Sequence, residues 1–529
     1  MAILFTLTFT FPIVALVEAK PKYWTLDPII IDDWGFGDYT WEQAASEPWC
    51  MGSGRLEDPY IIKKVVINGE DSPFCMVIRN SETYFKIMEC KFYNTRPSSA
   101  ERNAGLVLVS TQNGKILKNQ FIGNGWPGSG MGSGIALLYS YNNEIQKNLC
   151  SENAGPGIYL ESSNENVITQ NLCKKNEGGG ISIGEGSAFN EIIKNDCIRN
   201  GLGIILFNDC TNNEISDNLC SDNKRYGIQV WINSNYNTIS NNDCRKNLLS
   251  GILVGASHCN IISQNTCKKN GESGISIIDL YEMNAENNII YGNTINNNLK
   301  GIFFSNVDNN DILRNFIYKN TYGIILDIEC ENNLVYHNNL IKNVVQAWDF
   351  QIVSSNKWYH PYMLEGNYWS DYRGVDEDED GLGDTPFGYD EYPLMEKNGW
   401  EYMTPEEEEI LNVVNRLGAD RTVYANETSY IIYGVGQLFS ERIENTFCPP
   451  YTAHFNGTEA VDSVWFFRED VPGYSEPSLM QLYYIKYQPY YFTDELGLIP
   501  GYYEFEVELT WYDCGELNGM SFITGFYLV

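Results

Sequence analysis

Basic residues are scarce in this chain. It has 35 Lys and Arg against 69 Asp and Glu in 529 residues, and its formal net charge is −34. Nucleic-acid binding requires basic patches that neutralise phosphates, so the composition argues against a nucleic-acid partner. An excess of carboxylates is typical of a solvated surface or of a protein that binds Ca²⁺.

Long apolar runs are also absent after the N-terminus. Residues 2–17 are almost wholly apolar, and Val17-Glu18-Ala19 resembles a cleavage site, although no Lys or Arg precedes the run. A membrane-spanning helix needs about 20 apolar residues, and no second run of that length follows. We therefore expect residues 1–19 to be a signal peptide and the mature chain to be extracellular or on the cell surface, without a membrane span.

A repeat of 22 to 24 residues fills the middle of the chain and carries three marks. The first is a Gly-Ile pair, as at Gly157-Ile158. The second and third are Asn-x-Ile-x-x-Asn and Asn-x-(Cys or aliphatic)-x-x-Asn, as in residues 166–171 and 171–176. Three short strands per repeat fit this spacing, so the sequence predicts an all-β, right-handed parallel β-helix of about ten coils over residues 75–345.

Alternate strand residues should face inward, as for Ile158, Leu160, Ile168 and Cys173. We expect Asn at the corners because it tolerates left-handed φ and because stacked Asn side chains form amide ladders. The Gly before each Ile is expected to supply a further tight corner.

Six of the 14 cysteines recur every 23 or 24 residues, from Cys150 to Cys267. They occupy one inward column of the repeat and are predicted to be reduced core residues. The disulfide candidates are instead Cys50, Cys75 and Cys90, with Cys448–Cys514 as the favoured pair.

The flanking segments are predicted to be caps, because a solenoid must cover its ends. Residues 20–74 form the N-terminal cap and the entry to the helix, and residues 346–400 form the C-terminal cap. The latter contains an Asp-rich loop whose carboxylates and one carbonyl have the spacing of a structural Ca²⁺ site. The predicted ligands are Asp376, Asp378, Asp380, the Leu382 carbonyl and Asp384, with Asp371, Asp390 or Glu391 available to complete the shell.

Residues 401–529 lack the repeat. Apolar and polar residues alternate from Tyr503 to Trp511, which indicates a half-buried strand and, with similar segments, a β-sandwich-like domain. Asn426 and Asn456 begin N-x-[ST] sequons in this domain and are candidate glycosylation sites.

The coil pattern resembles the parallel β-helix (PbH1) repeat of NosD-like proteins, also described as CASH domains, within the pectin-lyase-like fold. The segments 52–62 and 367–394 are similar to those of archaeal surface members, so the resemblance covers roughly residues 50–395. NosD is named for copper delivery. This chain has four scattered histidines, His258, His337, His360 and His454, and no Met/His cluster, so no copper site is apparent.

Sugar-processing relatives of this fold use Asp clusters with basic side chains, and their motifs are missing here. The outward acids Glu161, Glu185, Asp209, Asp279 and Asp327 are expected to be spread across columns. Phe207 and Trp231 follow the Ile-x-aliphatic strand at equivalent places in adjacent coils and form a candidate carbohydrate-binding platform.

The sequence thus favours a non-catalytic surface protein whose partner is a polysaccharide or another surface component. The alternatives are a polysaccharide lyase, epimerase or hydrolase acting on uronate-containing glycans, and a passive surface or adhesin scaffold. The sequence does not predict an oligomeric state.

Overall fold

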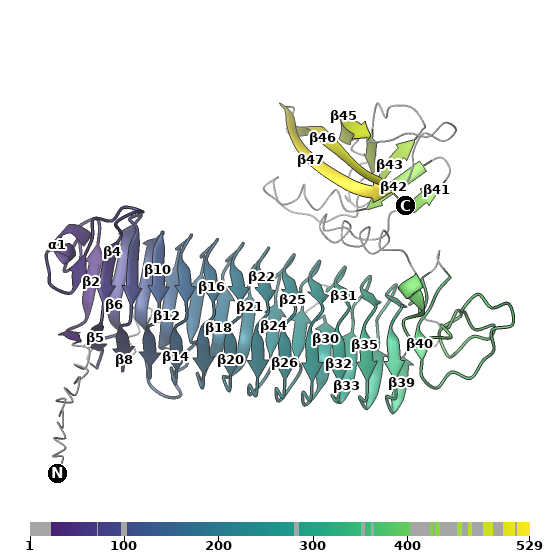
Figure 1. The fold of residues 1–529 in the computed structure, drawn as a ribbon, viewed down its shortest axis with the longest axis horizontal. Coiled ribbons are helices and arrows are strands. Elements are labelled where there is room, and N and C mark those ends of the chain that lie inside the picture. Colours follow the sequence, from purple (N-terminus) through teal and green to yellow (C-terminus); the bar gives the residue numbers. More distant parts are fainter. Residues whose placement is uncertain are drawn as a thin grey trace, which may run out of the picture.

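The computed structural model describes residues 23–402, apart from residue 71 and residues 97–102, 280–284, 351–354 and 361–363, together with a 7-stranded sheet between residues 424 and 528. Residues 24–369 wind into a parallel β-helix of about 12 turns, in which successive coils add strands to three sheets (Figure 1). The predicted fold class is confirmed. The coils begin before residue 75, however, because Trp24 already pairs in parallel with Val65.

The strands of each sheet stack in chain order. Sheet A contains β1 (Trp24–Leu26), β5 (Val65–Asn68), β8 (Lys91–Tyr93), β11 (Gln120–Ile122), β14 (Leu149–Ser151), β17 (Leu172–Lys174), β20 (Asp196–Ile198), β23 (Leu219–Ser221), β26 (Asp243–Arg245), β29 (Thr266–Lys268), β32 (Thr294–Asn296), β35 (Phe316–Tyr318), β38 (Asn339–Ile341) and β40 (Tyr368–Trp369). Sheet B contains β2 (Ile29–Asp32), β6 (Phe74–Ser81), β9 (Ala104–Thr111), β12 (Ser133–Leu138), β15 (Ile158–Glu161), β18 (Gly179–Gly184), β21 (Leu202–Phe207), β24 (Ile228–Trp231), β27 (Ile252–Gly255), β30 (Ser273–Ile278), β33 (Lys300–Ser305), β36 (Tyr322–Leu326) and β39 (Val345–Asp349). Sheet C contains β3 (Cys50–Met51), β4 (Tyr60–Lys63), β7 (Phe85–Met88), β10 (Gly114–Leu117), β13 (Glu144–Gln146), β16 (Val167–Thr169), β19 (Glu191–Ile193), β22 (Glu214–Ser216), β25 (Thr238–Ser240), β28 (Ile261–Ser263), β31 (Ile289–Tyr291), β34 (Asp311–Leu313) and β37 (Leu334–Tyr336).

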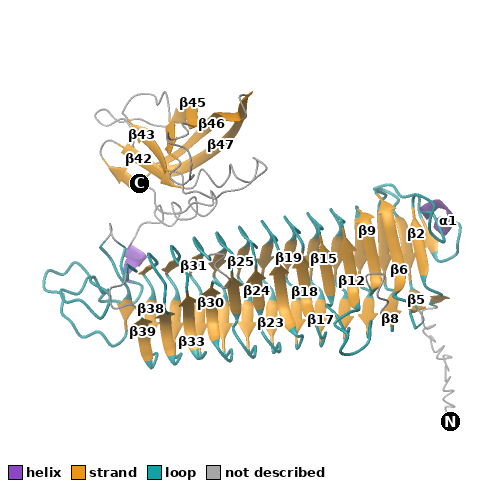
Figure 2. Cartoon of the chain, turned by 180° about the vertical axis from the view of Figure 1, so that it is seen from behind, coloured by secondary structure: helices purple, strands orange, loops and turns teal. Residues whose placement is uncertain are grey.

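The core follows from the period-two alternation of these strands. Ile158, Leu160 and Ile168 are fully buried inside the tube, and in the next coil Ile181 and Ile183 stack on the first two. A single coil could not bury these side chains, so each coil depends on its neighbours. Seen from behind, short loops join the strands at the corners (Figure 2).

The cysteine column lies inside this core, as predicted. Cys150, Cys173, Cys197, Cys220, Cys244 and Cys267 pair in register from strand to strand of sheet A and are fully buried, free thiols. The prediction of disulfides at Cys50, Cys75 and Cys90 is wrong, because all three are free and buried. Burial raises the pKa of the Cys75 and Cys90 thiols to about 12, so both thiols stay protonated.

Three continuous asparagine ladders run along the rod, one at each corner. In most steps the Oδ1 of one Asn accepts hydrogen bonds from the backbone N–H and the side-chain Nδ2 of the Asn one coil earlier. Ladder 1 precedes sheet C and comprises Asn143, Asn166, Asn190, Asn213, Asn237, Asn260, Asn288, Asn310, Asn333 and Asn356. Ladder 2 lies between sheets C and A and comprises Asn119, Asn148, Asn171, Asn195, Asn218, Asn242, Asn265, Asn293, Asn315, Asn338 and Asn367. Ladder 3 follows sheet A and comprises Asn124, Asn153, Asn176, Asn200, Asn223, Asn247, Asn270, Asn298, Asn320 and Asn343.

The predicted left-handed φ of these ladder residues is wrong. The positive φ lies on the residue before the Asn at every ladder position except Asn356 and Asn367, as at Lys194 (58°) before Asn195 and Phe189 (56°) before Asn190. The repeated Gly is likewise not a left-handed corner: a Cβ on Gly157 would lie 2.6 Å from the Gly180 carbonyl oxygen and 2.9 Å from the Asn176 Nδ2. This Gly is therefore required by the close approach of successive coils.

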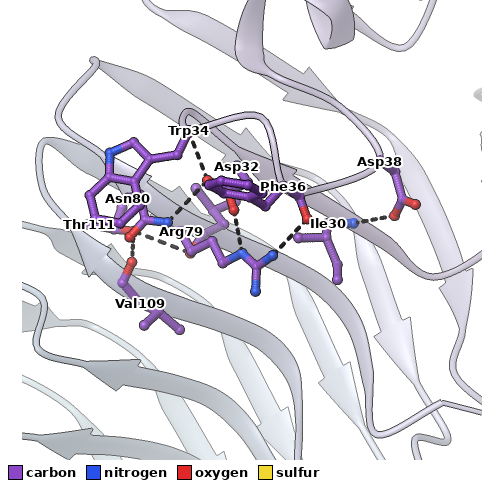
Figure 3. A network of polar contacts seen from close by, with 10 residues as sticks. Ile30, Asp32, Trp34, Phe36, Asp38, Arg79, Asn80, Val109 and Thr111 are labelled. Carbon is purple, nitrogen blue, oxygen red and sulfur yellow. Dashed lines mark hydrogen bonds and ion pairs between the residues drawn. The ribbon is translucent and has the colours of Figure 1, made fainter.

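The N-terminal end of the rod is closed by helix α1 (Trp41–Ala45), with Thr40 as its N-cap in a capping box with Gln43. Trp41 is buried and stacks on Tyr60 at 5.0 Å. Beside it, the buried Asp32 carboxylate accepts hydrogen bonds from Arg79 Nε (2.6 Å) and Asn80 Nδ2 (3.1 Å), as Figure 3 shows. This network ties β2 to β6.

The C-terminal end is covered by Trp358 and Trp369, which are both buried, and each ladder stops there on a new partner. Asn356 Nδ2 donates to Asp349 (3.2 Å), and the Asn367 backbone N–H donates to Asp390 (2.7 Å). Asn343 Nδ2 donates to Gln346 (2.9 Å), whose own amide donates to Asp371 (2.8 Å). The predicted cap over residues 346–400 thus also holds the ends of the ladders.

Beyond the short 3₁₀ helix η1 (Gly399–Tyr402), one antiparallel sheet contains the strands β41 (Tyr424–Asn426), β42 (Ser429–Tyr433), β43 (Thr452–Asn456), β44 (Val464–Phe467), β45 (Met480–Pro489), β46 (Gly501–Asp513) and β47 (Glu516–Leu528). The strand predicted from Tyr503 to Trp511 lies within β46. The sandwich arrangement stays a prediction.

Candidate binding face and acidic loop

Phe207 and Trp231 are neighbours on the outer face of sheet B. They pair in register at the ends of β21 and β24, and both side chains are half-buried. Each lies over a glycine in the coil on its far side: a Cβ on Gly184 would lie 2.4 Å from Phe207 Cζ, and one on Gly255 would lie 2.2 Å from Trp231 Cζ3. The two rings therefore lean away from each other along the rod axis, and each lies against backbone that has no side chain to lift it.

A second aromatic group lies farther along the same face and was missed from the sequence. Phe303, Ile325 and Trp348 occupy one outward column of sheet B, and Tyr322 lies 6.3 Å from Trp348, centroid to centroid. Trp348 also stacks on Phe350 at 5.1 Å. The coil between Asn260 and Asn288 is longer than the others, with 28 residues from one Asn to the next, but the ladder stays in register across it. Aligning the later coils with the earlier ones across this longer coil would have found the group.

Carboxylates line one edge of this face, where the chain turns from sheet B to sheet C. Glu161 accepts a hydrogen bond from the Tyr159 hydroxyl (2.9 Å), and Glu185 accepts one from Asn208 Nδ2 (3.0 Å). Asp209 and Asp327 lie at the same edge, two residues after Phe207 and one after Leu326. These acids follow one edge over many coils and do not converge into a pair of the kind that glycosidases use.

Lys300 is the cation on the outer face of β33. Its Nζ lies 3.3 Å from the centroid of the Phe303 ring, near Asp327 and Glu272. Partial burial lowers the pKa of Lys300, and the two carboxylates act against that shift. The ring and the acids therefore hold this ammonium group in place.

The predicted acidic loop brings three of its carboxylates together. One oxygen each from Asp376, Asp378 and Asp380 lies within 4.8 Å of the others, and the described part of the chain has no other group of three or more His, Cys, Asp or Glu this close. Asp376 also accepts hydrogen bonds from the backbone N–H of Asp380 (3.1 Å) and Gly381 (3.0 Å), which curls the loop around its first carboxylate.

The other predicted ligands are placed differently. Asp384 accepts a hydrogen bond from the Glu377 backbone N–H (2.7 Å) and so closes the loop. The backbone of Leu382 bridges to Leu394, which anchors the loop on the cap. Asp390 is not available to complete a shell, because its carboxylate is buried beneath Trp369 and accepts a hydrogen bond from Trp369 Nε1 (2.7 Å). Asp371 instead accepts a hydrogen bond from Gln346.

A histidine group in the C-terminal cap was not predicted from the sequence. His337 Nε2 lies 2.7 Å from a Glu365 carboxylate oxygen, and the His337 ring stacks on Trp400 at 5.5 Å. His360 is buried beside it against Tyr336. Burial lowers the pKa of His337, and burial together with the nearby His337 lowers the pKa of His360 to about 4.

Several predicted sites lie outside the described residues. They are the signal peptide at residues 1–19 and the Cys448–Cys514 pair. For the sequons, β41 contains Asn426 and β43 contains Asn456, and their side chains are likewise outside the description. No helix in the described part of the chain has the length and apolar character needed to cross a membrane.

The three stacked sheets and the polar ladders define a parallel β-helix repeat protein. A family model described as "Right handed beta helix region" matches residues 60–218, and one described as "Periplasmic copper-binding protein (NosD)" matches residues 190–374. These matches and the stacked coils fit a NosD-like right-handed β-helix protein.

One curated relative and two solved structures illustrate the likeness. The probable ABC transporter binding protein NosD of Stutzerimonas stutzeri is 35% identical over 88 residues, which are 17% of this chain and 20% of that protein. The chain thus matches about a fifth of the relative's length. The Dettilon tailspike protein (gp208) is 13% identical with a TM-score of 0.45, over 88% of this chain and 87% of that chain. A mutant of the periplasmic alginate epimerase AlgG is 16% identical with a TM-score of 0.37, over 53% of this chain and 77% of that chain.

Proposed function

We propose that this chain is an exported cell-surface protein that binds carbohydrate without catalysis through the outer face of sheet B. The observation that carries the proposal is the seating of Phe207 and Trp231 over Gly184 and Gly255. A ring that lies along the sheet offers its free face to solvent, and sugar rings stack on such faces. The rings lean apart, so they are separated by about three strand spacings, or ~14 Å, and suit an extended polymer.

The arrangement of the ionisable groups supports binding over catalysis. A general acid usually has a raised pKa and lies near a second carboxylate. Among the described residues, burial raises the pKa of the Asp33 and Asp390 carboxyl groups, the latter to about 6, and both lie in the caps. Export is supported by the NosD family, whose description is periplasmic.

Replacing Trp231 by Ala is expected to weaken polysaccharide binding about tenfold or more, because about 1.4 kcal/mol or more of stacking is lost. Gly255→Ala is expected to weaken binding similarly with the ring still present, because the new Cβ would overlap it. The matched control is Tyr318→Ala, a half-exposed aromatic on sheet A. Affinity electrophoresis against β-glucan, chitosan and polygalacturonate measures the three variants.

Two outcomes would contradict this proposal. Release of unsaturated or shortened products from any of these polymers would favour the lyase, epimerase or hydrolase. Absence of binding to every polymer and to a glycan array would favour the passive scaffold.

We further propose that the 376–384 loop binds Ca²⁺ and stabilises the C-terminal cap. Hard carboxylate oxygens grouped within 4.8 Å suit a hard divalent cation. Ca²⁺ at 100 times its dissociation constant should add about 2.7 kcal/mol to the free energy of unfolding of the cap. Chelation should therefore lower the melting temperature, and Asp378→Ala should abolish that response.

The control variant for the loop is Glu377→Gln, because Glu377 lies in the same loop with its side chain outside the carboxylate group. It should keep the response to chelation. A melting temperature that is the same with and without Ca²⁺ in the unmodified protein would rule the site out.

A further inference from the structure

The edge of sheet B beside the aromatic rings carries charge of one sign. From Glu161 to Asn333, the turns from sheet B to sheet C contain no Lys or Arg. Their described carboxylates are Glu165, Glu185, Asp209, Asp279, Glu286, Asp308, Asp327, Glu329 and Glu331. This acidic edge, as we name it, includes the coils of Phe207 and Phe303 and is interrupted after β24 and β27, whose turns contain no carboxylate.

Coil stacking fixes the acidic edge relative to the rings. Glu161 and Gly184 are register partners, and Gly184 is the residue over which the Phe207 ring lies. Asp279 directly follows Ile278, the register partner of Gly255, over which the Trp231 ring lies. Each ring of the platform therefore has a carboxylate within about one coil of the residue beneath it.

The remaining charge on and beside the face lies farther from Phe207 and Trp231. Lys300 lies over the Phe303 ring with Asp327 and Glu272 near it. The opposite edge, where sheet A turns into sheet B, carries more Lys and Arg than Asp and Glu, but Phe207 and Trp231 are the last residues of β21 and β24 and so lie beside the acidic edge. A polyanion laid along the rings would thus meet a row of carboxylates, and like charges brought together cost affinity.

We infer that the ligand of this face is a glycan whose sugars carry protonated amino groups, and that uronate polymers are excluded from it. This inference rests on the proposed function, because the aromatic face supplies the stacking and the acidic edge selects the charge. Ammonium groups spaced along a polymer can approach successive carboxylates while the sugar rings stack. Complementary charge also makes the affinity depend on salt.

The test uses the full chain and three hexasaccharides: glucosamine (cationic at pH 6), N-acetylglucosamine (neutral) and galacturonate (anionic). Isothermal titration at low salt should give at least tenfold tighter binding of the cationic oligomer than of the neutral one, with the anionic oligomer weakest. Raising the salt concentration to physiological strength should reduce the difference in affinity between the cationic and the neutral hexasaccharide. The Asp209→Asn and Asp279→Asn variants should each bind the cationic oligomer a few-fold more weakly than the unmodified chain does. Their affinity for the neutral oligomer should be unchanged.

The control variant is Glu191→Gln, which removes an exposed carboxylate from sheet C. It should alter none of the three affinities. Tightest binding of the galacturonate oligomer, or equal binding of the neutral and cationic oligomers, would overturn the inference and leave the proposed function intact. Failure of all three to bind, with Trp231→Ala indistinguishable from the unmodified chain, would instead overturn the proposed function.

Discussion

Replacing Asn195 by Ala should lower the free energy of unfolding by about 2–6 kcal/mol, because the buried Asn171 N–H and Ile168 carbonyl each lose a hydrogen-bond partner. Asn195 Oδ1 accepts hydrogen bonds from the Asn171 backbone N–H (2.9 Å) and side chain (3.0 Å), and its Nδ2 donates to the Ile168 carbonyl (2.7 Å). The site is fully buried, so water cannot replace these partners. Chemical denaturation and amide hydrogen exchange measure the loss.

The exchange data should show where the loss falls. Because each coil contacts only its neighbours, protection should fall most in the strands beside ladder 2, within a coil or two of the substitution. Asp196→Ala changes the next residue, whose side chain is exposed, and should cost less than about 0.5 kcal/mol. A cost below about 1 kcal/mol for Asn195→Ala would mean that the ladders do not carry the stability assigned to them.

His360→Gln should remove about 3 kcal/mol of acid-induced destabilisation from the C-terminal cap. The pKa of His360 falls from 6.5 in the unfolded chain to about 4 in the fold. Between these values the folded chain binds fewer protons, so the contribution of His360 is present above pH 6.5 and is lost as the pH falls towards 4. The measurement is the free energy of unfolding of both proteins from pH 7 to pH 4.

Asp390 contributes a pH dependence of stability that is opposite in sign to that of His360. Burial raises the pKa of its carboxyl group from 3.8 to about 6, so its contribution is greatest below pH 3.8 and is lost as the pH rises through 6. The pH profile of the unmodified cap therefore combines two contributions of opposite sign, and His360→Gln should remove the contribution of His360 while keeping that of Asp390. If His360→Gln and the unmodified protein have parallel pH profiles, the histidine does not couple to folding of the cap.

The middle of the rod could be predicted from the sequence because every coil repeats the same inward residues. The first coils could not, since β4 and β5 bury Ile62, Val65 and Ile67 without the Asn and Gly-Ile marks. The corner conformations were also misassigned. Pattern alone does not reveal that the residue before nearly every ladder Asn takes the positive φ, because Lys, Gln, Phe and Glu all occupy that position.

The candidate sites divide in the same way. Phe207 and Trp231 could be found because they occupy equivalent places in adjacent coils, whereas their seating depends on Gly184 and Gly255, one coil further out on each side. The acidic loop could be found because its carboxylates are close in sequence. The His337–Glu365 contact could not, because it joins a corner of the last coils to the cap that folds over them.

The ladders also have a direction. In most steps the side-chain Nδ2 donates to the Asn nearer the C-terminal end, and the Oδ1 accepts from the Asn nearer the N-terminal end, so these amide dipoles add along the rod, as peptide dipoles add along a helix. The positive end of each stack meets a carboxylate: Asp349 for ladder 1, Asp390 for ladder 2 and, through Gln346, Asp371 for ladder 3. An aspartate carboxylate accepts these hydrogen bonds but has no N–H group to donate to a further residue. The ladder therefore ends at the aspartate. Each ladder thus ends on a carboxylate of the C-terminal cap, and inserting or removing whole coils upstream is expected to leave these end contacts unchanged.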